Sequence, residues 1–591
     1  MPGIVGIIGR GPSEAYQRQI KTMLATMMHE QSYVAGTHAA PELGVYAGWT
    51  AHDEREAAAR ITFDDRGDRA LIFAGECGGR ALLKGYDRDG DEFVTAIDGS
   101  FAGMLIDPLQ GRAVLFNDRF GAERIYYHET SSALYFASEA KALLSVLPQL
   151  RAFDDDGVVQ FLIYGAALPD RTLFRDLRVM QPGSIWAFDG HLPLARRLYF
   201  DPNAWRELPE LTAEQFREEL SDALQSAVKR CVSSQASIGI SITGGLDTRM
   251  VMALLPETTR TPICYTFVGV EGETLDARLG KRVAQACGLE HHLLRVGPDF
   301  LADYGHYVDR TVFVTDGYAG ALGAHEIYLN AKAKQLAPVR MTGNFGSEIL
   351  RGMSTFKPIN LAEDVLDPCL QSRLASLRER DVAPETHPVI FAAFHEIPSI
   401  HYGIPAAARS QVTLRTPFMS NAVVQLAVRA PAAERNSPSA CAELVARHNH
   451  VLGRIPTDRG VLPDSKLRPR PWSRLLSEVT FKLDYLHKEG LAPPLTKLEP
   501  GFRLLSHTRL LGVHKFLPYR NWFKQELAGY VASVLSDPST RRMSWWNGAT
   551  LDRILPDHQK GRRNYLREIH AILTLEAVQR RLIGSTVRDP A

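Results

Sequence analysis

The sequence lacks a strong net charge, a basic leader and a long apolar run. Its 68 lysines and arginines nearly balance its 67 aspartates and glutamates, so no global electrostatic signature of a nucleic-acid or acidic-membrane binder is present. No uninterrupted apolar stretch approaches the roughly 18 residues that a membrane span needs. No basic residue precedes the apolar run near the start, as a secretory signal would require. We therefore expect no nucleic-acid partner, no membrane and a cytoplasmic location.

Cysteine is also scarce, with six residues spread through 591. None forms a C-x-x-C pair, so the sequence carries no zinc-ribbon or dithiol redox motif. Scattered thiols are typical of proteins from a reducing compartment. The length exceeds what one core fills, and prolines 193, 202 and 209 indicate a linker. We expect one domain over residues 1–195 and a second over residues 210–591.

Short apolar runs between turn residues dominate the first of these regions. Examples are Ile4–Ile8, Leu43–Trp49 and Phe101–Ile106, and such runs indicate β-strands. Between the first two runs, Ile20–Met28 carries apolar residues at helical spacing. The pattern predicts a layered α+β sandwich.

Several short motifs follow one another through this region in a recognisable order. They are Gly3–Ile7, Gly75-Glu76, Asp98–Ala102, Asn117–Gly121, Tyr126-Tyr127 and Phe136–Leu143. Together they resemble the class II glutamine amidotransferase domain, and the resemblance implies an N-terminal nucleophile hydrolase fold. In that family a cysteine after the initiator Met attacks the glutamine amide, with its own α-amine as base.

The residues expected to hydrolyse glutamine are absent. Pro2 stands at the nucleophile position, and proline has no thiol with which to form the covalent intermediate. Trp49 stands where the family places an arginine for the glutamine carboxylate, and Ala74 where an asparagine supplies an oxyanion donor. Asp98 remains. Cys77 has no α-amine base beside it, so we interpret it as a packed thiol and expect no glutamine hydrolysis.

The second region opens with a helix and a strand that lead into a glycine-rich turn. Thr212 and Gln215 form a candidate capping box, and the apolar run Ile238–Ile242 enters Thr243-Gly244-Gly245-Leu246-Asp247-Thr248. A strand, glycine-rich turn and helix present backbone N–H groups to an anion. The turn resembles the Ser-Gly-Gly-x-Asp-Ser loop of N-type ATP pyrophosphatases, which implies an α/β domain with a parallel sheet. By that resemblance Thr243, Gly244, Gly245, Asp247 and Thr248 hold pyrophosphate.

Further motifs extend the resemblance to the nucleotide site. Tyr265–Val268 reads as the second strand, where Phe267 and Val268 would contact adenine. Met341–Glu348 resembles the family's Leu-Ser-Gly-x-Gly-Ala-Asp-Glu and supplies Gly343 for the nucleotide and Glu348 as a catalytic carboxylate. Ser347 replaces the Asp.

One carboxylate is left for a metal ion. Asp247 is therefore the candidate Mg²⁺ ligand, because carboxylate oxygen suits a hard cation. The pair His291-His292 is interpreted as structural, since no further ligands are evident.

The sequence offers two more catalytic candidates. Arg415–Met419 resembles the family's Arg-x-Pro-Phe-Leu, with Ser420 in place of the next Asp. In that family a lysine shortly beyond this motif neutralises the α-phosphate in the transition state. By the resemblance, Lys466 is our candidate for that role, with Arg459 as the alternative. Asp316 is the candidate base for the incoming amine, and a loop-capping role is the alternative.

In order and spacing, these motifs resemble the asparagine synthetase family. The resemblance implies that a carboxylate attacks Mg-ATP to give an acyl-adenylate, and that an amine then displaces AMP. With an impaired first domain, the chain resembles the branch that contains β-lactam synthetases and lasso-peptide cyclases. That branch implies a small-molecule or peptide carboxylate and ring closure or amine ligation in specialised metabolism.

Other interpretations remain open at this point. One is a glutamine- or ammonia-dependent asparagine synthase. Another is a catalytically silent nucleotide-binding scaffold. A homodimer is also compatible with the sequence.

Overall fold

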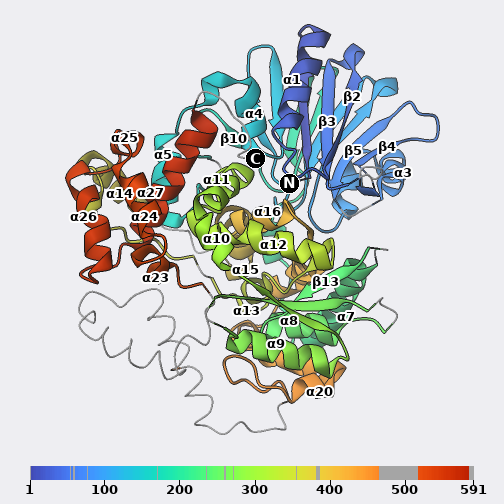
Figure 1. Cartoon of the computed structure of the whole chain (residues 1–591). Helices are drawn as coiled ribbons and strands as arrows, with labels where there is room; N and C mark the ends of the chain where they lie inside the picture. The colour runs from blue at the N-terminus through green and yellow to red at the C-terminus, as the bar shows by residue number, and fades with distance from the viewer. Residues whose placement is uncertain are drawn as a thin grey trace.

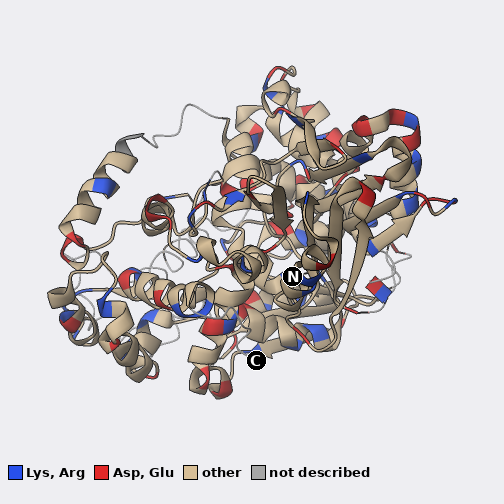
Figure 2. Ribbon diagram, turned by 90° about the horizontal axis from the view of Figure 1, so that it is seen from above, with Lys and Arg blue, Asp and Glu red and all other residues tan. Residues whose placement is uncertain are grey.

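The computed structural model shows two sheet-containing regions and a helical carboxyl-terminal part (Figure 1). It describes residues 2–464, 479 and 517–584, apart from residues 54, 57–59, 76, 77, 170, 234, 235, 258–260, 271, 355 and 381–386. Within these residues no helix is long and apolar enough to cross a membrane. Lys and Arg alternate with Asp and Glu over the ribbon in Figure 2, consistent with the balanced composition.

The amino-terminal region contains two six-stranded antiparallel sheets. The first has, in order, β10 (Arg178–Val179), β8 (Tyr126–Glu129), β9 (Ala133–Ala137), β1 (Ile4–Gly9), β3 (Val45–Ala51) and β2 (Val34–Ala40). The second has β12 (Leu192–Leu198), β11 (Ser184–Asp189), β7 (Arg112–Asn117), β6 (Phe101–Asp107), β5 (Ala70–Gly75) and β4 (Ile61–Phe63).

Apolar side chains alternate between the two faces of each strand, so the two sheets pack on each other and helices pack on their outer faces. On β1, Ile4 and Ile8 belong to the core shared with the second sheet, whereas Val5 and Ile7 pack with α1 (Ser13–Ala25). On the far side of the second sheet, α3 (Gly79–Asp89) packs on a separate apolar cluster. Because successive strand residues face opposite sides, both faces of each sheet are covered. The predicted α+β sandwich is confirmed.

The second region is built on a five-stranded parallel sheet, as the sequence predicts. Its order is β15 (His291–Arg295), β14 (Ile263–Val268), β13 (Ile238–Ser241), β16 (Val339–Met341) and β17 (Thr413–Arg415). The helices that position the site are α7 (Ala213–Val232), α8 (Leu246–Ala253), α9 (Leu275–Ala286), α11 (Tyr304–Thr315), α12 (His325–Leu336) and α13 (Gly346–Arg351). The Thr212–Gln215 capping box at the start of α7 is confirmed.

The carboxyl-terminal helices join the two regions through a common apolar core. They are α23 (Tyr519–Lys524), α24 (Ala528–Ser536), α26 (Gly548–Gln559) and α27 (Leu566–Val578), drawn in red in Figure 1. The predicted stripe Leu566, Ile569, Leu573 and Ala577 is buried on α27, which packs against α11. The same core includes residues of α4 (Ala140–Val146) and α5 (Asp155–Tyr164) from the amino-terminal region.

Candidate functional site

The glycine-rich turn lies at the carboxyl end of β13, the central strand of the parallel sheet. Gly245 is the N-cap residue of α8. The first N–H groups of this helix therefore have no acceptor within the helix. The Thr243 and Thr248 hydroxyls lie 3.3 Å apart, and Gly245 donates its N–H to Thr243 Oγ1 at 3.3 Å. The geometry is a compact nest of N–H and hydroxyl donors, which suits an anion.

Two charged side chains, Asp276 and Arg249, hold the turn in place. Gly244 donates its N–H to Asp276 Oδ1 at 2.8 Å. Burial, then the charge of Asp458, raise the pKa of Asp276 to about 6, while the Gly244 N–H opposes the rise. Beneath the turn Arg249 is fully buried and donates to the Gly244 carbonyl at 3.2 Å. These contacts fix the loop before a ligand arrives.

Asp247 is tied to α13 by a bidentate ion pair. Arg351 contacts its two carboxylate oxygens at 2.9 and 3.1 Å, and Ser347 donates its hydroxyl at 2.8 Å. Ser347, which replaces the family's Asp, thus helps to orient Asp247. Each oxygen of a carboxylate has two lone pairs, so Asp247 can still offer one ligand to a phosphate-bound Mg²⁺. Among the described residues no cluster of three or more His, Cys, Asp or Glu is placed to hold a metal by itself.

A cavity of 530 Å³ opens in front of this turn and contains most of the predicted site residues. Thr243, Gly245, Asp247, Thr248, Phe267, Gly343 and Glu348 line it. Gly244 lies in the glycine-rich turn and Val268 lies at the end of β14, but neither is among the residues that line the cavity. Lys466 lies outside the described residues.

Close packing explains the glycine at position 343. A Cβ there would lie 2.6 Å from the Thr248 nitrogen and 2.9 Å from the Asp247 carbonyl carbon. The backbone of the turn after β16 therefore packs directly against the backbone of the glycine-rich turn. Gly343 supports the loop as well as lining the cavity.

Glu348 is a partly desolvated carboxylate on α13. Burial raises its pKa, the charge of His401 lowers it, and the charges of Asp247 and Glu396 raise it further. A raised pKa is common among groups that exchange protons during catalysis.

Several residues of this cavity carry no sequence signal that we recognised. Arg340 on β16 lies 4.7 Å from the Phe267 ring centroid and donates to Asn330 at 2.8 Å. His401 follows a π-helical segment, η7 (Ala392–Ile400), and also lines the cavity. A lone charged residue in a short strand and a lone histidine after a helix resemble many structural residues, which explains why both were missed. His291, in contrast, contacts the Thr266 hydroxyl at 2.9 Å, as a structural histidine would.

A second, narrower cavity of 140 Å³ lies between the two regions. Its lining includes Pro2 and Ala74, the positions where a nucleophile and an oxyanion donor were expected. Phe345, His401 and Pro405 line both cavities. The narrower cavity that contains Pro2 and the cavity in front of the glycine-rich turn therefore share one boundary.

Asp98, which the sequence retains, is committed to the interface between the regions. Its carboxylate accepts from the Ser420 hydroxyl at 3.0 Å and the Asn421 N–H at 2.7 Å, and pairs with Arg230 at 2.7 Å. The Ser420 substitution is thus explained locally, since its hydroxyl donates to a carboxylate across the interface. These contacts occupy both carboxylate oxygens of Asp98.

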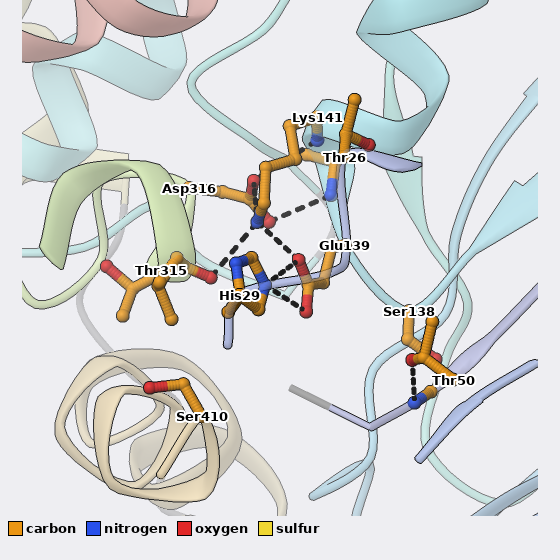
Figure 3. A network of polar contacts seen from close by, with 12 residues as sticks. Thr26, His29, Thr50, Ser138, Glu139, Lys141, Thr315, Asp316 and Ser410 are labelled. Atoms are coloured by element: carbon orange, nitrogen blue, oxygen red, sulfur yellow. Dashed lines mark hydrogen bonds and ion pairs between the residues drawn. The ribbon is translucent and has the colours of Figure 1, made fainter. Parts of the chain in front are cut away.

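Asp316 lies in another interface site and not among the cavity-lining residues. It is 1% exposed, has a left-handed backbone at the end of α11, and accepts from the N–H groups of Ala140 and Lys141. Figure 3 shows it pointing toward Lys141, which in turn pairs with Glu139 beside His29. The structure therefore does not bring Asp316 together with the glycine-rich turn, and its contacts are those of a helix cap.

Comparisons with known proteins match the two regions separately. The model described as glutamine amidotransferase domain matches residues 66–192, and the model described as asparagine synthase matches residues 219–390. Cys77 and Glu76, which fall in the first match, lie outside the described residues.

Curated relatives show the same likeness. The chain is 24% identical over 282 residues to putative asparagine synthetase (glutamine-hydrolyzing) 2 of Methanocaldococcus jannaschii, covering 46% of this chain and 53% of that protein. It is 24% identical over 285 residues to asparagine synthetase (glutamine-hydrolyzing) 1 of Bacillus subtilis, covering 47% and 44%. With asparagine synthetase B (glutamine-hydrolyzing) of Escherichia coli it shares 24% over 331 residues, covering 52% and 53%. These alignments span about half the length of each relative.

Proposed function

We propose that the chain uses ATP to form an amide bond between a carboxylate and an amine. The proposal starts from its membership of the asparagine synthetase family. The carboxylate attacks the α-phosphate, pyrophosphate leaves, and an acyl-adenylate remains. An amine then displaces AMP. The observation that carries the proposal is the donor nest of Thr243, Gly245 and Thr248 at the floor of the 530 Å³ cavity.

Within this mechanism the chain supplies position and charge and little covalent chemistry. The nest holds the leaving pyrophosphate, and the Arg351–Asp247 pair keeps α13 against the loop. Mg²⁺, when bound with ATP, would neutralise phosphate oxygens, with Asp247 as its protein carboxylate. The ring of Phe267 would contact the adenine. Lys466 or Arg459 remains our candidate for the charge near the α-phosphate.

The amine in this proposal does not come from glutamine. Pro2 supplies no nucleophile, and Asp98 is occupied by Ser420, Asn421 and Arg230. The amino-terminal region then serves to cover the second region. Ring closure or amine ligation on a small-molecule or peptide substrate in specialised metabolism follows as the preferred reaction, in the cytoplasm.

A second candidate function is glutamine- or ammonia-dependent asparagine synthesis. The relatives' printed names favour it, since each is called glutamine-hydrolyzing. The loss of Cys, Arg and Asn at three glutamine positions favours the first candidate.

Pyrophosphate release tests both. The purified chain is incubated with Mg-ATP and a panel of carboxylates, including L-aspartate, amino-carboxylates that can close a ring, and short peptides. We expect carboxylate-dependent release that Thr248→Val lowers and Thr248→Ser retains, since serine keeps the hydroxyl that contacts Thr243. ATP binding without release from any carboxylate would overturn the proposal in favour of a silent scaffold.

A further inference from the structure

The π-helical segment η7 brings two side chains together that an α-helix would separate. His401 donates its backbone N–H to the Glu396 carbonyl at 3.1 Å, an i to i−5 contact. In an α-helix, residues five apart differ by about 140° around the axis. The π-turn instead places His401 Nε2 at 3.1 Å from Glu396 Oε1. The π-helix is rare in proteins and is frequently found at functional sites.

Glu396 is a fixed partner for this imidazole. Its side chain is fully buried, and the Ser354 hydroxyl donates to its other oxygen at 2.9 Å. A buried carboxylate beside a histidine orients the ring and stabilises the imidazolium that forms when the ring accepts a proton. With Nε2–H donating to Glu396, Nδ1 is the acceptor nitrogen of the neutral ring.

The imidazole lies at the boundary of the two cavities. Of the described residues that line both, Phe345, His401 and Pro405, His401 has the titratable side chain. The charge of His401 also acts on Glu348, so the ring lies within electrostatic reach of the cavity in front of the glycine-rich turn. Asp316, the base expected from the sequence, is engaged elsewhere by the N–H groups of Ala140 and Lys141.

We propose that His401, oriented by Glu396, is the catalytic residue that accepts the proton of the attacking amine. The inference rests on the proposed function. As the amine nitrogen bonds to the acyl carbon, the carbon–oxygen bond to AMP breaks and AMP leaves with the electron pair. His401 Nδ1 takes the proton that the amine loses. Glu396 is a positioning residue for this step.

Replacing the amine by hydroxylamine separates this step from adenylation, because hydroxylamine traps acyl-adenylates without an enzymic base. His401→Gln is assayed with Mg-ATP and the carboxylate that releases pyrophosphate. We expect hydroxamate formation within about twofold of the wild type, and amide formation from ammonium chloride or the substrate amine lower by about 100-fold or more. Glu396→Gln should lower amide formation by a smaller factor and also spare the hydroxamate.

His395→Gln is the matched control, since His395 lies on the same π-helical segment and stacks on Phe391, outside both cavities. It should retain both activities. His401→Asn guards against a folding defect of the glutamine variant. Equal loss of hydroxamate and amide in both folded His401 variants would overturn this inference alone. Absence of pyrophosphate release by the wild type would overturn the inference together with the proposed function.

Discussion

Asp316 of the parallel-sheet region caps the helix that begins at Ala140 in the amino-terminal region. Its carboxylate accepts from the Ala140 N–H at 2.8 Å and the Lys141 N–H at 3.1 Å, and the Lys141 ammonium lies 3.5 Å away. The α4 N-terminus is therefore stabilised by a charge from the other region, because the helix dipole favours an anion there. Burial raises the pKa of Asp316, while Lys141 opposes the rise.

Asp316→Ala should destabilise the protein by about 3 kcal/mol, because it leaves two N–H groups and a buried ammonium without this acceptor. Chemical denaturation measures the change. Asp303→Asn, an exposed position at the other end of α11 whose side chain makes no cap contact, is the control and should stay within about 0.5 kcal/mol. A folded Asp316→Asn variant that adenylates but forms no amide would instead support the catalytic-base hypothesis.

The contact between two turns gives a steric prediction. Gly343→Ala should lower both stability and ATP affinity, since its Cβ would meet the Thr248 nitrogen at 2.6 Å, and backbone cannot give way cheaply. The expected loss of stability is about 1 to 3 kcal/mol. Thermal unfolding with and without ATP measures both effects.

Gly245→Ala is the matched comparison. Its Cβ would meet only the Thr243 hydroxyl, at 3.5 Å, and the backbone φ is −76°. It should lose no more than about 1 kcal/mol, the ordinary cost of alanine at an N-cap. Equal stability of the Gly343 and Gly245 variants would show that the turns do not press together as described.

Local sequence signals predicted the elements well where one pattern dominated. The apolar run before Thr243 and the capping box at Thr212 depend on neighbours in sequence, and β13 and α7 follow them. The fold class followed from motif order. Contacts between segments far apart in the sequence could not be predicted in this way, because no local pattern indicates them. Nothing near Asp98 indicates that Asn421 and Arg230 will occupy it.

The same limit explains the candidate site. The turn Thr243–Thr248 is local, so its donors could be named from sequence. His401 reaches the site only because η7 departs from α-helical geometry, around Pro398. Asp316 looked equally suited to base and cap, and only its partners across the interface distinguish the two.

Asp276 predicts a specific pH dependence of stability. Its pKa is raised from the ordinary 3.8 to about 6, first by burial and then by Asp458. The folded protein therefore binds this proton more tightly than the unfolded chain does. The resulting stabilisation is complete below about pH 4 and is lost as the pH rises through 6.

Asp276→Asn removes this titration because an amide stays neutral. The free energy of unfolding of the wild type, minus that of the variant, should fall between pH 4.5 and 7. Urea denaturation at several pH values within this window gives the difference. A difference that is constant, or that rises with pH, would contradict the assigned direction of the pKa shift.

The amino-terminal cavity gives a prediction about glutamine. The wild type should release no ammonia from glutamine, and Pro2→Cys should not restore release. A thiol at position 2 would enter the cavity, but of the arginines that line it Arg60 is paired with Glu56 and Arg409 with Glu123. Asp98 is held by Arg230, and Ala74 supplies no side-chain oxyanion donor. A thiol alone would accelerate glutamine hydrolysis little, because substrate binding and oxyanion stabilisation are what lower the activation barrier of that reaction.

A coupled ammonia assay with glutamine measures this, and Pro2→Ser serves as the matched control for the change in backbone. Because Pro2 is buried where the chain enters β1, the unfolding temperature of each variant is measured alongside. Ammonia release by the wild type would favour glutamine-dependent synthesis, the second candidate function. Release by Pro2→Cys alone would mean that the single missing thiol, and not the occupied Asp98, separates this chain from its glutamine-hydrolysing relatives.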